Sequence, residues 1–465
     1  MASRDQQLMS EKRQKSQIEL AFTYGPKGEA RKDTEEGTEA LMAKGVSESP
    51  TGSQRLMEAV CETGNLKRAL RRVKANRGSP GIDGMRVDQL GQYLIGHWGE
   101  IRGQLLSGTY KAEPVRRVEI PKPDGGKRTL GIPTVLDRFV QQAMLQVLQQ
   151  QWEPTFSIHS HGFRPGHSQH GAIAEAQQYL TEGYGWVVDL DLEKFFDRVN
   201  HDRLMSRLAE RISDKRMLKL IGGFLRAGVL EGGVVSPSEE GTPQGGPLSP
   251  LLSNIVLDEL DKELERRGHR FVRYADDCNI YVRSERAGKR VMEHITRFIT
   301  RKLKLRVNEK KSAVGRPHER KFLGFSFTRE EKPRRTIAPK SIQRAKNRLR
   351  ELTRRKRGGK LEVIVEELNR YLTGWFGYYG FSETRTALRD LDRWLRRRLR
   401  SLLWKRWKTP QRRYRELRHH GATHDLARNT ASSGKGPWAL SASKALSFAL
   451  PNVFFDSLGL FRLYV

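Results

Sequence analysis

Cysteine is the rarest functional residue in this 465-residue chain, which contains only Cys61 and Cys278. Two cysteines exclude a disulfide framework and a zinc site built from several thiolates, so we expect no zinc. No apolar run approaches the roughly 20 residues that cross a bilayer. The first residues, MASRDQQLMSEKRQKSQ, also lack the apolar segment of a signal peptide. These absences predict a cytoplasmic protein with no membrane anchor.

Acidic residues are scarce as well, because 54 Asp and Glu stand against 86 Lys and Arg and leave a formal net charge of +32. An excess of this size repels itself in the folded state and indicates a polyanionic partner. Nucleic acid is the leading candidate, and an acidic membrane surface is the alternative. The mean hydropathy of −0.67 is low. A hydrophobic content of 37% nevertheless allows several modest cores in a chain long enough for about three domains.

Composition divides the chain into segments. Residues 1–53 are polar without sustained periodicity, and we predict that they are mostly disordered. Residues 54–77 predict a basic helix, and KFLGFSF (321–327) predicts a strand. Beyond about residue 333 the composition shifts to basic helices, beginning with 341–356, that carry leucine stripes. This density of Lys and Arg favours contact with a nucleic-acid backbone over a merely solvated face.

Acidic side chains gather in two stretches. In WVVDLDLEKFFD, strand alternation places Asp189 and Asp191 on one face of an apolar strand. In FVRYADDCNIYVR, two runs of β-branched and aromatic residues predict a β-hairpin with Asp276 and Asp277 at its tip. Neighbouring carboxylates repel and raise each other's pKa, and a divalent cation removes that penalty. An isolated Asp-Asp pair is more often a solvated turn, so the other motifs must show whether this pair belongs to a metal site.

Three loops accompany the acids. KPDGGKR (122–128) is a hairpin turn whose cations suit phosphate oxygens, although an ordinary charged hairpin has the same pattern. GTPQGGPLSPLLSNIVLDEL (241–260) either lets the backbone approach a ligand closely or simply precedes a core helix. HSHGFRPGHSQHG (159–171) has four histidines, but Gly and Pro interrupt the spacing that a metal requires. We interpret Arg164 in this loop as a backbone or phosphate contact.

In this order the motifs resemble those of the reverse transcriptases encoded by group II introns, which double as maturases. The resemblance covers most of the chain, from about residue 54 to 420. WVVDLDLEKFFDRVNH resembles motif A, GTPQGGPLSPLLSNI motif B and RYADD motif C. RRVEIPKPDGGKRTLGIPT and GFRPGHSQHGA resemble the first two polymerase blocks, KFLGFSF the primer grip, GSPGIDG the N-terminal extension block and GWFGYYG part of the thumb. PQGGPLSP and YADD in tandem are highly specific.

The resemblance implies an α+β fold: a right-hand polymerase with an antiparallel-sheet palm and helical fingers, followed by an α-helical thumb or maturase domain. We expect an N-terminal extension over 1–53, fingers and palm over 54–330, a thumb over 335–410 and a C-terminal DNA-binding tail over 411–465. Many relatives end in a zinc-stabilised His-Asn-His nuclease domain. Because both cysteines lie elsewhere and the chain stops too soon, we expect the bacterial type that lacks it.

The resemblance also assigns residues. The motif A ligand of this family is followed five positions later by a bulky aromatic, which selects Asp191 with Phe196. Asp189 has Lys194 at that spacing and is secondary. The implied catalytic acids and ligands of two Mg²⁺ are Asp191, Asp276, Asp277 and, through its backbone carbonyl, Leu192. The implied nucleotide contacts are Arg116, Lys122, Arg128, Phe196 and Gln244. The implied primer and template contacts are Tyr274, Ala275, Phe322, Leu323 and Gly324.

The implied function is RNA-directed DNA synthesis, in which two Mg²⁺ and dNTPs extend a DNA primer on an RNA template. A Phe196 ring packed against the sugar would exclude a 2′-hydroxyl and favour dNTPs. Binding of the parent intron RNA would assist splicing and retrohoming in the bacterial cytoplasm. The expected partners are therefore intron RNA, the DNA target and primer, and dNTPs, with a monomer and a dimer on RNA both open.

Two alternatives remain at this point. One is a maturase that binds RNA without polymerase activity, and three converging acids speak against it. The other is a reverse transcriptase of another bacterial retroelement, such as a retron or a diversity-generating element. The long basic thumb and the PQGGPLSP block weigh against that alternative.

Overall fold

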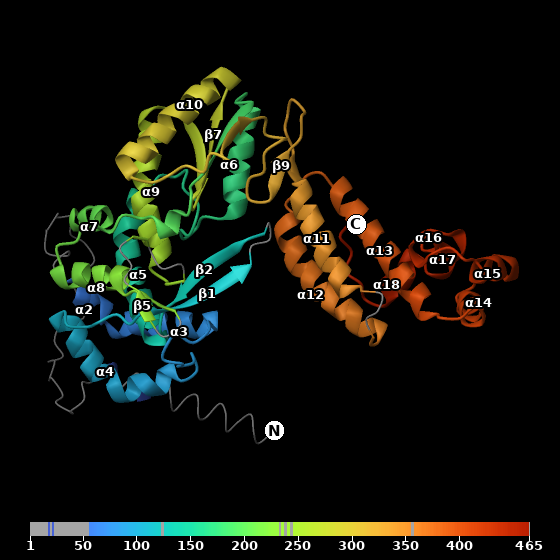
Figure 1. Cartoon of the computed structure of the whole chain (residues 1–465), viewed down its shortest axis with the longest axis horizontal. Helices are drawn as coiled ribbons and strands as arrows, with labels where there is room; N and C mark the ends of the chain where they lie inside the picture. Colours follow the sequence, from blue (N-terminus) through green and yellow to red (C-terminus); the bar gives the residue numbers. More distant parts are fainter. Residues whose placement is uncertain are drawn as a thin grey trace, which may run out of the picture. The chain divides into compact units, whose positions relative to one another are not determined.

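The computed structural model describes residues 17–18, 21–22, 55–121, 125–231, 234–236, 240–241, 245–354 and 358–464 (Figure 1). Lys122, Gln244 and most of the predicted extension lie outside these residues. Contacts divide the chain into two compact units. Unit 1 comprises 1–168, 189–280 and 289–313, and unit 2 comprises 169–188, 281–288 and 314–465. None of the described helices is both long enough and apolar enough to cross a membrane.

The described N-terminal part of unit 1, over residues 55–107, is mainly helical. The single helix expected over 54–77 is in fact two, because the backbone of Glu62 is extended (φ −63°, ψ 133°). The second helix buries an apolar stripe of Leu66, Ala69, Leu70 and Val73, since residues three and four apart share one helical face. Phe22, which lies in the segment predicted to be mostly disordered, is also buried, with its ring centroid 5.3 Å from that of Trp98. The helices described in unit 1 include α2 (Leu56–Val60), α3 (Thr63–Asn76), α4 (Leu90–Ser107), α5 (Val135–Trp152), α7 (His201–Ala209), α8 (Lys215–Arg226) and α9 (Ser249–Arg266).

The basic hairpin expected around residues 122–128 is flanked by two paired strands of unit 1. Strand β1 (Val115–Pro121) runs antiparallel to β2 (Lys127–Ile132), with Ile120 opposite Arg128. Two short strands extend the sheet in the order β2-β1-β4-β5, and they are β4 (Val229–Glu231) and β5 (Val234–Ser236). Most residues of β1 are half-buried or exposed, as expected for a sheet that has one solvated face.

A second four-stranded sheet, in the order β6-β7-β3-β8, carries the acidic motifs. Its strands are β6 (Arg270–Tyr274), β7 (Asp277–Val282), β3 (Trp186–Asp191) and β8 (Ala313–Gly315). The hairpin predicted around YADD is therefore β6 and β7. The alternation predicted in β3 is also present, because Val188 and Leu190 are buried whereas Asp189 and Asp191 are half-buried. After β7, α10 (Glu285–Phe298) continues into a π-helical turn over Ile299–Leu303.

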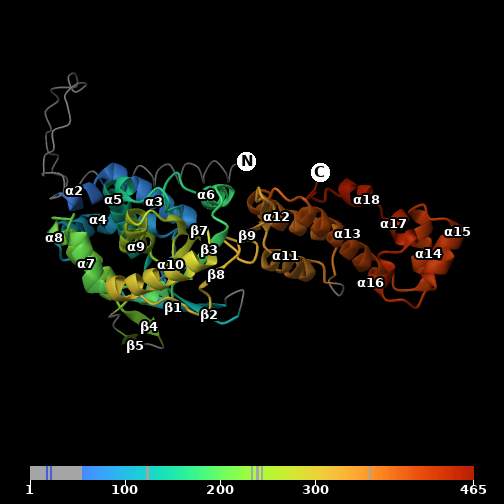
Figure 2. The ribbon, with the colours of Figure 1, turned by 90° about the horizontal axis from the view of Figure 1, so that it is seen from above.

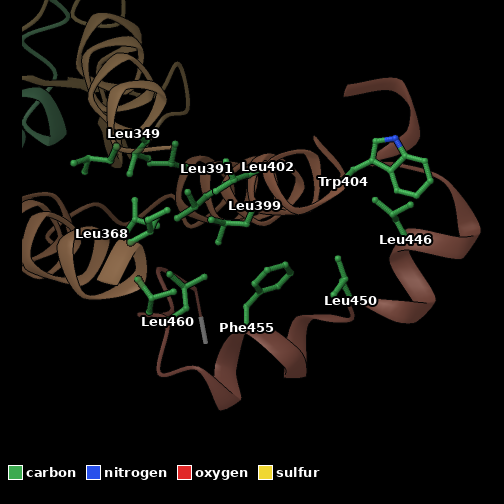
Figure 3. Packing of buried hydrophobic residues seen from close by; sticks show 14 of the residues in the cluster. Leu349, Leu368, Leu391, Leu399, Leu402, Trp404, Leu446, Leu450, Phe455 and Leu460 are labelled. Carbon is green, nitrogen blue, oxygen red and sulfur yellow. The ribbon is translucent and has the colours of Figure 1, made fainter. Parts of the chain in front are cut away.

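The C-terminal part of unit 2 is helical. The leucine stripes predicted from the sequence form one hydrophobic cluster, to which Leu368, Leu399 and Phe455 belong (Figure 3). Residues on both sides of the expected boundary at 410 contribute to this cluster, and α14, α15 and α17 group together (Figure 2). The elements of unit 2 include α6 (Gln169–Thr181), β9 (Phe325–Phe327), β10 (Arg335–Ile337), α11 (Pro339–Leu352), α12 (Leu361–Tyr379), α13 (Thr386–Arg406), α14 (Pro410–His419), α15 (His424–Ala431), α16 (Pro437–Leu440), α17 (Lys444–Ala449) and α18 (Asn452–Ser457).

The strand expected over 321–327 is wrong in its first half. Only Phe325–Phe327 is a strand, and it pairs antiparallel with β10. Leu323 (φ 50°) and Gly324 (φ 83°) have left-handed backbone conformations and turn the chain sharply. Phe322 and Phe325 close this turn by exchanging two N–H···O bonds of 2.9 Å. Glycine supplies positive φ at little cost, and this local turn chemistry overrides the β propensity of the flanking phenylalanines.

Candidate active site

The turn between β6 and β7 holds the motif C acids in unit 1. Ala275 lies at its tip with a left-handed backbone (φ 57°), Asp276 follows, and Asp277 begins β7. Burial raises the pKa of the Asp276 carboxyl, and the nearby Asp191 carboxylate raises it further. The guanidinium groups of Arg128 and Arg273 act in the opposite direction. The turn therefore brings one acid of motif C within electrostatic reach of the predicted acid of motif A.

Asp191 is fixed by its backbone at the end of β3. Its N–H donates to Ser312 Oγ at 2.9 Å, and its carbonyl oxygen accepts from the N–H of Asn308 at 2.8 Å. The Lys311 ammonium lies 3.6 Å from Asp191 Oδ2. The sequence alone did not indicate that Lys311 lies beside Asp191, because 120 residues separate the two in sequence.

The acids suit a divalent cation by chemical type. Carboxylate oxygens are the hard ligands that Mg²⁺ prefers, and a cation would offset the burial and the nearby Asp191 carboxylate, which both raise the pKa of Asp276. Asp277 and Asp189 both act on the thiol of Cys278, whose pKa is raised chiefly by burial. Within the described part of the chain, however, no three Asp, Glu, His or Cys side chains already form a metal cluster. The three-acid ligand set stays a prediction.

Some of the segments that are expected to contact the nucleotide lie close together in unit 1. A side chain on Gly241 would begin 2.8 Å from the carbonyl oxygen of Phe196, and one on Gly245 would begin 2.6 Å from that of Gly131. The glycine-rich loop therefore lies against both the Phe196 turn and β2, where only glycine fits. Arg116 has a buried Nε without a hydrogen-bond partner.

The remaining predicted positions are placed as follows. Leu192 is buried and forms a bridge with Val307. Tyr274 is half-buried, with its ring centroid 6.3 Å from that of Phe163. The expected primer-grip residues lie in unit 2 on the tight turn before β9, where Tyr378 Oη donates to the carbonyl oxygen of Leu323 at 2.6 Å.

The histidine-rich loop is ordered by polar contacts. Arg164 donates to the carbonyl oxygen of Ser160 at 2.7 Å and pairs with Glu153 at 2.8 Å, which confirms the interpretation of Arg164 as a backbone contact. The rings of His161 and His167 lie 5.1 Å apart. These contacts hold the loop in place next to the acidic turn.

Two family models match the chain. "Reverse transcriptase (RNA-dependent DNA polymerase)" matches residues 120–327, and "Group II intron, maturase-specific domain" matches residues 342–421. The first match contains both acidic strands and the glycine-rich loop, and the second begins in α11 and ends after α14.

Individual relatives agree. Protein YkfC of Escherichia coli is 35% identical over 320 residues, which cover 60% of this chain and 84% of YkfC. The group II intron-encoded protein LtrA of Lactococcus lactis is 32% identical over 48% of each chain. A COX1/OXI3 intron 2 protein of Saccharomyces cerevisiae is 34% identical over 49% of this chain and 26% of its own length. The chain thus matches about half or less of these two intron proteins.

A solved partial Cas6-RT-Cas1–Cas2 complex has 26% identity and a TM-score of 0.35 over 57% of this chain and 46% of its own. A TM-score of 0.35 is too low for this similarity to support a conclusion about fold or function. The sheet with its acidic hairpin and the matched models define a polymerase of the reverse transcriptase class, with the expected α+β fold. The chain belongs to the group II intron-encoded reverse transcriptase and maturase family.

Proposed function

We propose that the chain extends a DNA primer with dNTPs on an RNA template and that Asp191, Asp276 and Asp277 are its catalytic acids. One observation carries this assignment: β7, which begins at Asp277, and β3, which ends at Asp191, are neighbouring strands of one sheet, and the Asp191 carboxylate acts on the Asp276 carboxyl. Acids from two separate strands can then hold the same metal ions, as metal-assisted nucleotidyl transfer requires.

Two Mg²⁺ ions would be held by these carboxylates and the Leu192 carbonyl, and they would activate the primer 3′-hydroxyl and stabilise the pyrophosphate leaving group. The protein's own side chains bind the nucleotide. Arg116, Lys122 and Arg128 neutralise the triphosphate. Phe196 excludes a 2′-hydroxyl from the sugar pocket, and Gln244, which is assigned by the family resemblance alone, contacts the nucleotide.

The second part of the proposal concerns RNA. The maturase-specific match over 342–421 and the net charge of +32 support binding of a large group II intron RNA by the thumb (335–410) and the C-terminal tail (411–465). Such binding assists splicing and retrohoming. The similar proteins of Escherichia coli and Lactococcus lactis support action in a bacterial cytoplasm.

The deciding experiment is primer extension on an RNA template with Mg²⁺ and dNTPs. We expect cDNA from the wild type and none from Asp276→Asn or Asp191→Asn. Asp189→Asn is the matched control, because this acid shares the face of β3 but was assigned a secondary role. Absence of cDNA synthesis by the wild type would refute the polymerase assignment. If Asp189→Asn is inactive and Asp191→Asn is active, Asp189 rather than Asp191 is the metal ligand.

A further inference from the structure

A buried arginine directly precedes the motif C turn. Arg273 on β6 and Asp261 on α9 are both fully buried, with side-chain exposures of 0% each. Arg273 Nε donates to Asp261 Oδ1 at 2.7 Å, and Nη2 donates to Asp261 Oδ2 at 2.5 Å. The guanidinium thus holds the carboxylate in a two-pronged pair, the strongest geometry open to these groups.

The remaining donors of this guanidinium reach the turn itself. Nη1 donates to the carbonyl oxygen of Ala275 at 2.8 Å and to Asn254 Oδ1 at 3.0 Å. Nη2 also donates to Ser160 Oγ at 2.7 Å. All five N–H groups of Arg273 are therefore used. The Ala275 carbonyl belongs to the peptide group that joins Ala275 to Asp276, so Arg273 directly restrains the backbone that carries the first motif C acid.

The histidine-rich loop passes directly against the turn. A side chain on Gly162 would begin 2.2 Å from the backbone nitrogen of Ala275, so only glycine can pass this close. Asn254 Nδ2 donates to the carbonyl oxygen of Gly162 at 2.9 Å, while Asn254 Oδ1 accepts from Arg273. Asn254 therefore links this loop to Arg273. Ala275 keeps a left-handed conformation (φ 57°), which is strained for a residue with a Cβ.

Stability alone does not explain a buried ion pair at this place. Replacing such a pair with apolar residues of similar volume is often neutral or stabilising, whereas an apolar side chain could not bind the Ala275 carbonyl. Asn254 and Asp261 are seven residues apart on α9, two helical turns, and so share one helical face. The same helix follows the glycine-rich loop, so the network connects motif B with motif C.

We propose that Arg273, held by Asp261 and Asn254, is a positioning residue that fixes the Ala275–Asp276 peptide and so aims the Asp276 carboxylate at the metal ions. This role rests on the proposed function, because it presupposes that Asp276 is catalytic. Arg273 touches no substrate; it acts through the backbone.

The test compares Arg273→Lys and Asp261→Asn with Asp258→Asn, a control that removes a buried acid one turn away on α9 whose partners are Lys262 and Arg207. Single-turnover primer extension is measured over dNTP and Mg²⁺ concentrations, with thermal unfolding and primer-template affinity in parallel. A displacement near 1 Å can cost about 100-fold in rate. We expect the two network variants to lose roughly ten- to 100-fold in maximal rate and to need more Mg²⁺, with KM for dNTP and primer-template affinity near wild type.

Loss of thermal stability with an unchanged maximal rate per folded molecule would overturn the positioning role. If neither network variant folds, Asn254→Ala decides, since it keeps the ion pair but removes the link to Gly162; a wild-type rate and Mg²⁺ requirement in this variant would refute the inference. The proposed function fails separately, through an inactive wild type or an active Asp276→Asn.

Discussion

Asp137 shows how one buried carboxyl makes the fold sensitive to pH. It accepts a bond of 2.8 Å from Tyr110 Oη and one of 3.1 Å from the N–H of Glu113, yet burial raises its pKa from 3.8 to about 6. Between these values the folded state binds more protons than the unfolded state. Stability at this site is therefore greatest below pH 4 or so, declines as the pH rises through the window, and is constant above about 6.

We therefore expect Asp137→Asn to remove a pH-dependent stability difference of about 3 kcal/mol between roughly pH 4 and 6.5. The free energy of unfolding is measured by urea denaturation across that range. Asp202→Asn, which changes an exposed acid in the first turn of α7, is the control. If wild type and Asp137→Asn keep parallel profiles, Asp137 does not titrate in this window.

Lys311 gives a second prediction at the scale of the residue. Its ammonium lies 3.6 Å from Asp191 Oδ2 and offsets the repulsion between Asp191 and Asp276. Lys311→Ala should reduce the rate of primer extension at least about tenfold, and Lys310→Ala, the adjacent exposed lysine, should have a much smaller effect. Equal rates in the two variants would show that the position beside Asp191 has no influence on catalysis.

At the scale of the element, the turn before β9 requires glycine. A side chain on Gly324 would begin 2.7 Å from Tyr379 Oη and would have to keep a φ of 83°. Gly324→Ala should therefore destabilise unit 2 by more than about 1 kcal/mol. It should also weaken primer extension if this turn grips the primer.

The matched change is Gly377→Ala, on the exposed face of α12, where a new side chain meets nothing within 4 Å. Because alanine favours helix over glycine, this variant should gain up to about 1 kcal/mol. Unfolding followed by circular dichroism compares the two. A Gly324→Ala protein as stable as wild type would show that the turn relaxes without cost.

At the scale of the whole molecule, the charge of +32 predicts RNA binding that weakens steeply with salt. A protein with 6–10 phosphate contacts loses about 10³–10⁵ in affinity between 50 and 200 mM salt. Lys340 and Arg344 are exposed four residues apart on α11. Their joint replacement by Ala should lower the slope of log affinity against log salt by about 1.5, whereas Gln343→Ala on the same helix should leave it unchanged. An unaltered slope in the double variant would place the RNA elsewhere.

Much of this fold could be predicted because its signals are local. Strand alternation identified the acidic face of β3, runs of β-branched and aromatic residues identified the β6–β7 hairpin, and helical spacing identified the buried leucines of α12 and α13. Errors arose where a short signal was read as a longer element. The helix expected over 54–77 breaks at Glu62, and the strand expected over 321–327 turns at Leu323 and Gly324.

The sequence by itself determined the basic charge, the pattern of apolar and acidic residues and the order of the motifs, because these depend on neighbours only a few positions apart. Only the tertiary structure decided that Arg273 joins Ser160, Asn254, Asp261 and Ala275, and that Lys311 lies beside Asp191. Those contacts follow from how strands pair and where α9 packs, which no local periodicity encodes. Burial has the same origin, and it is burial that raises the pKa of Asp137 and Asp276.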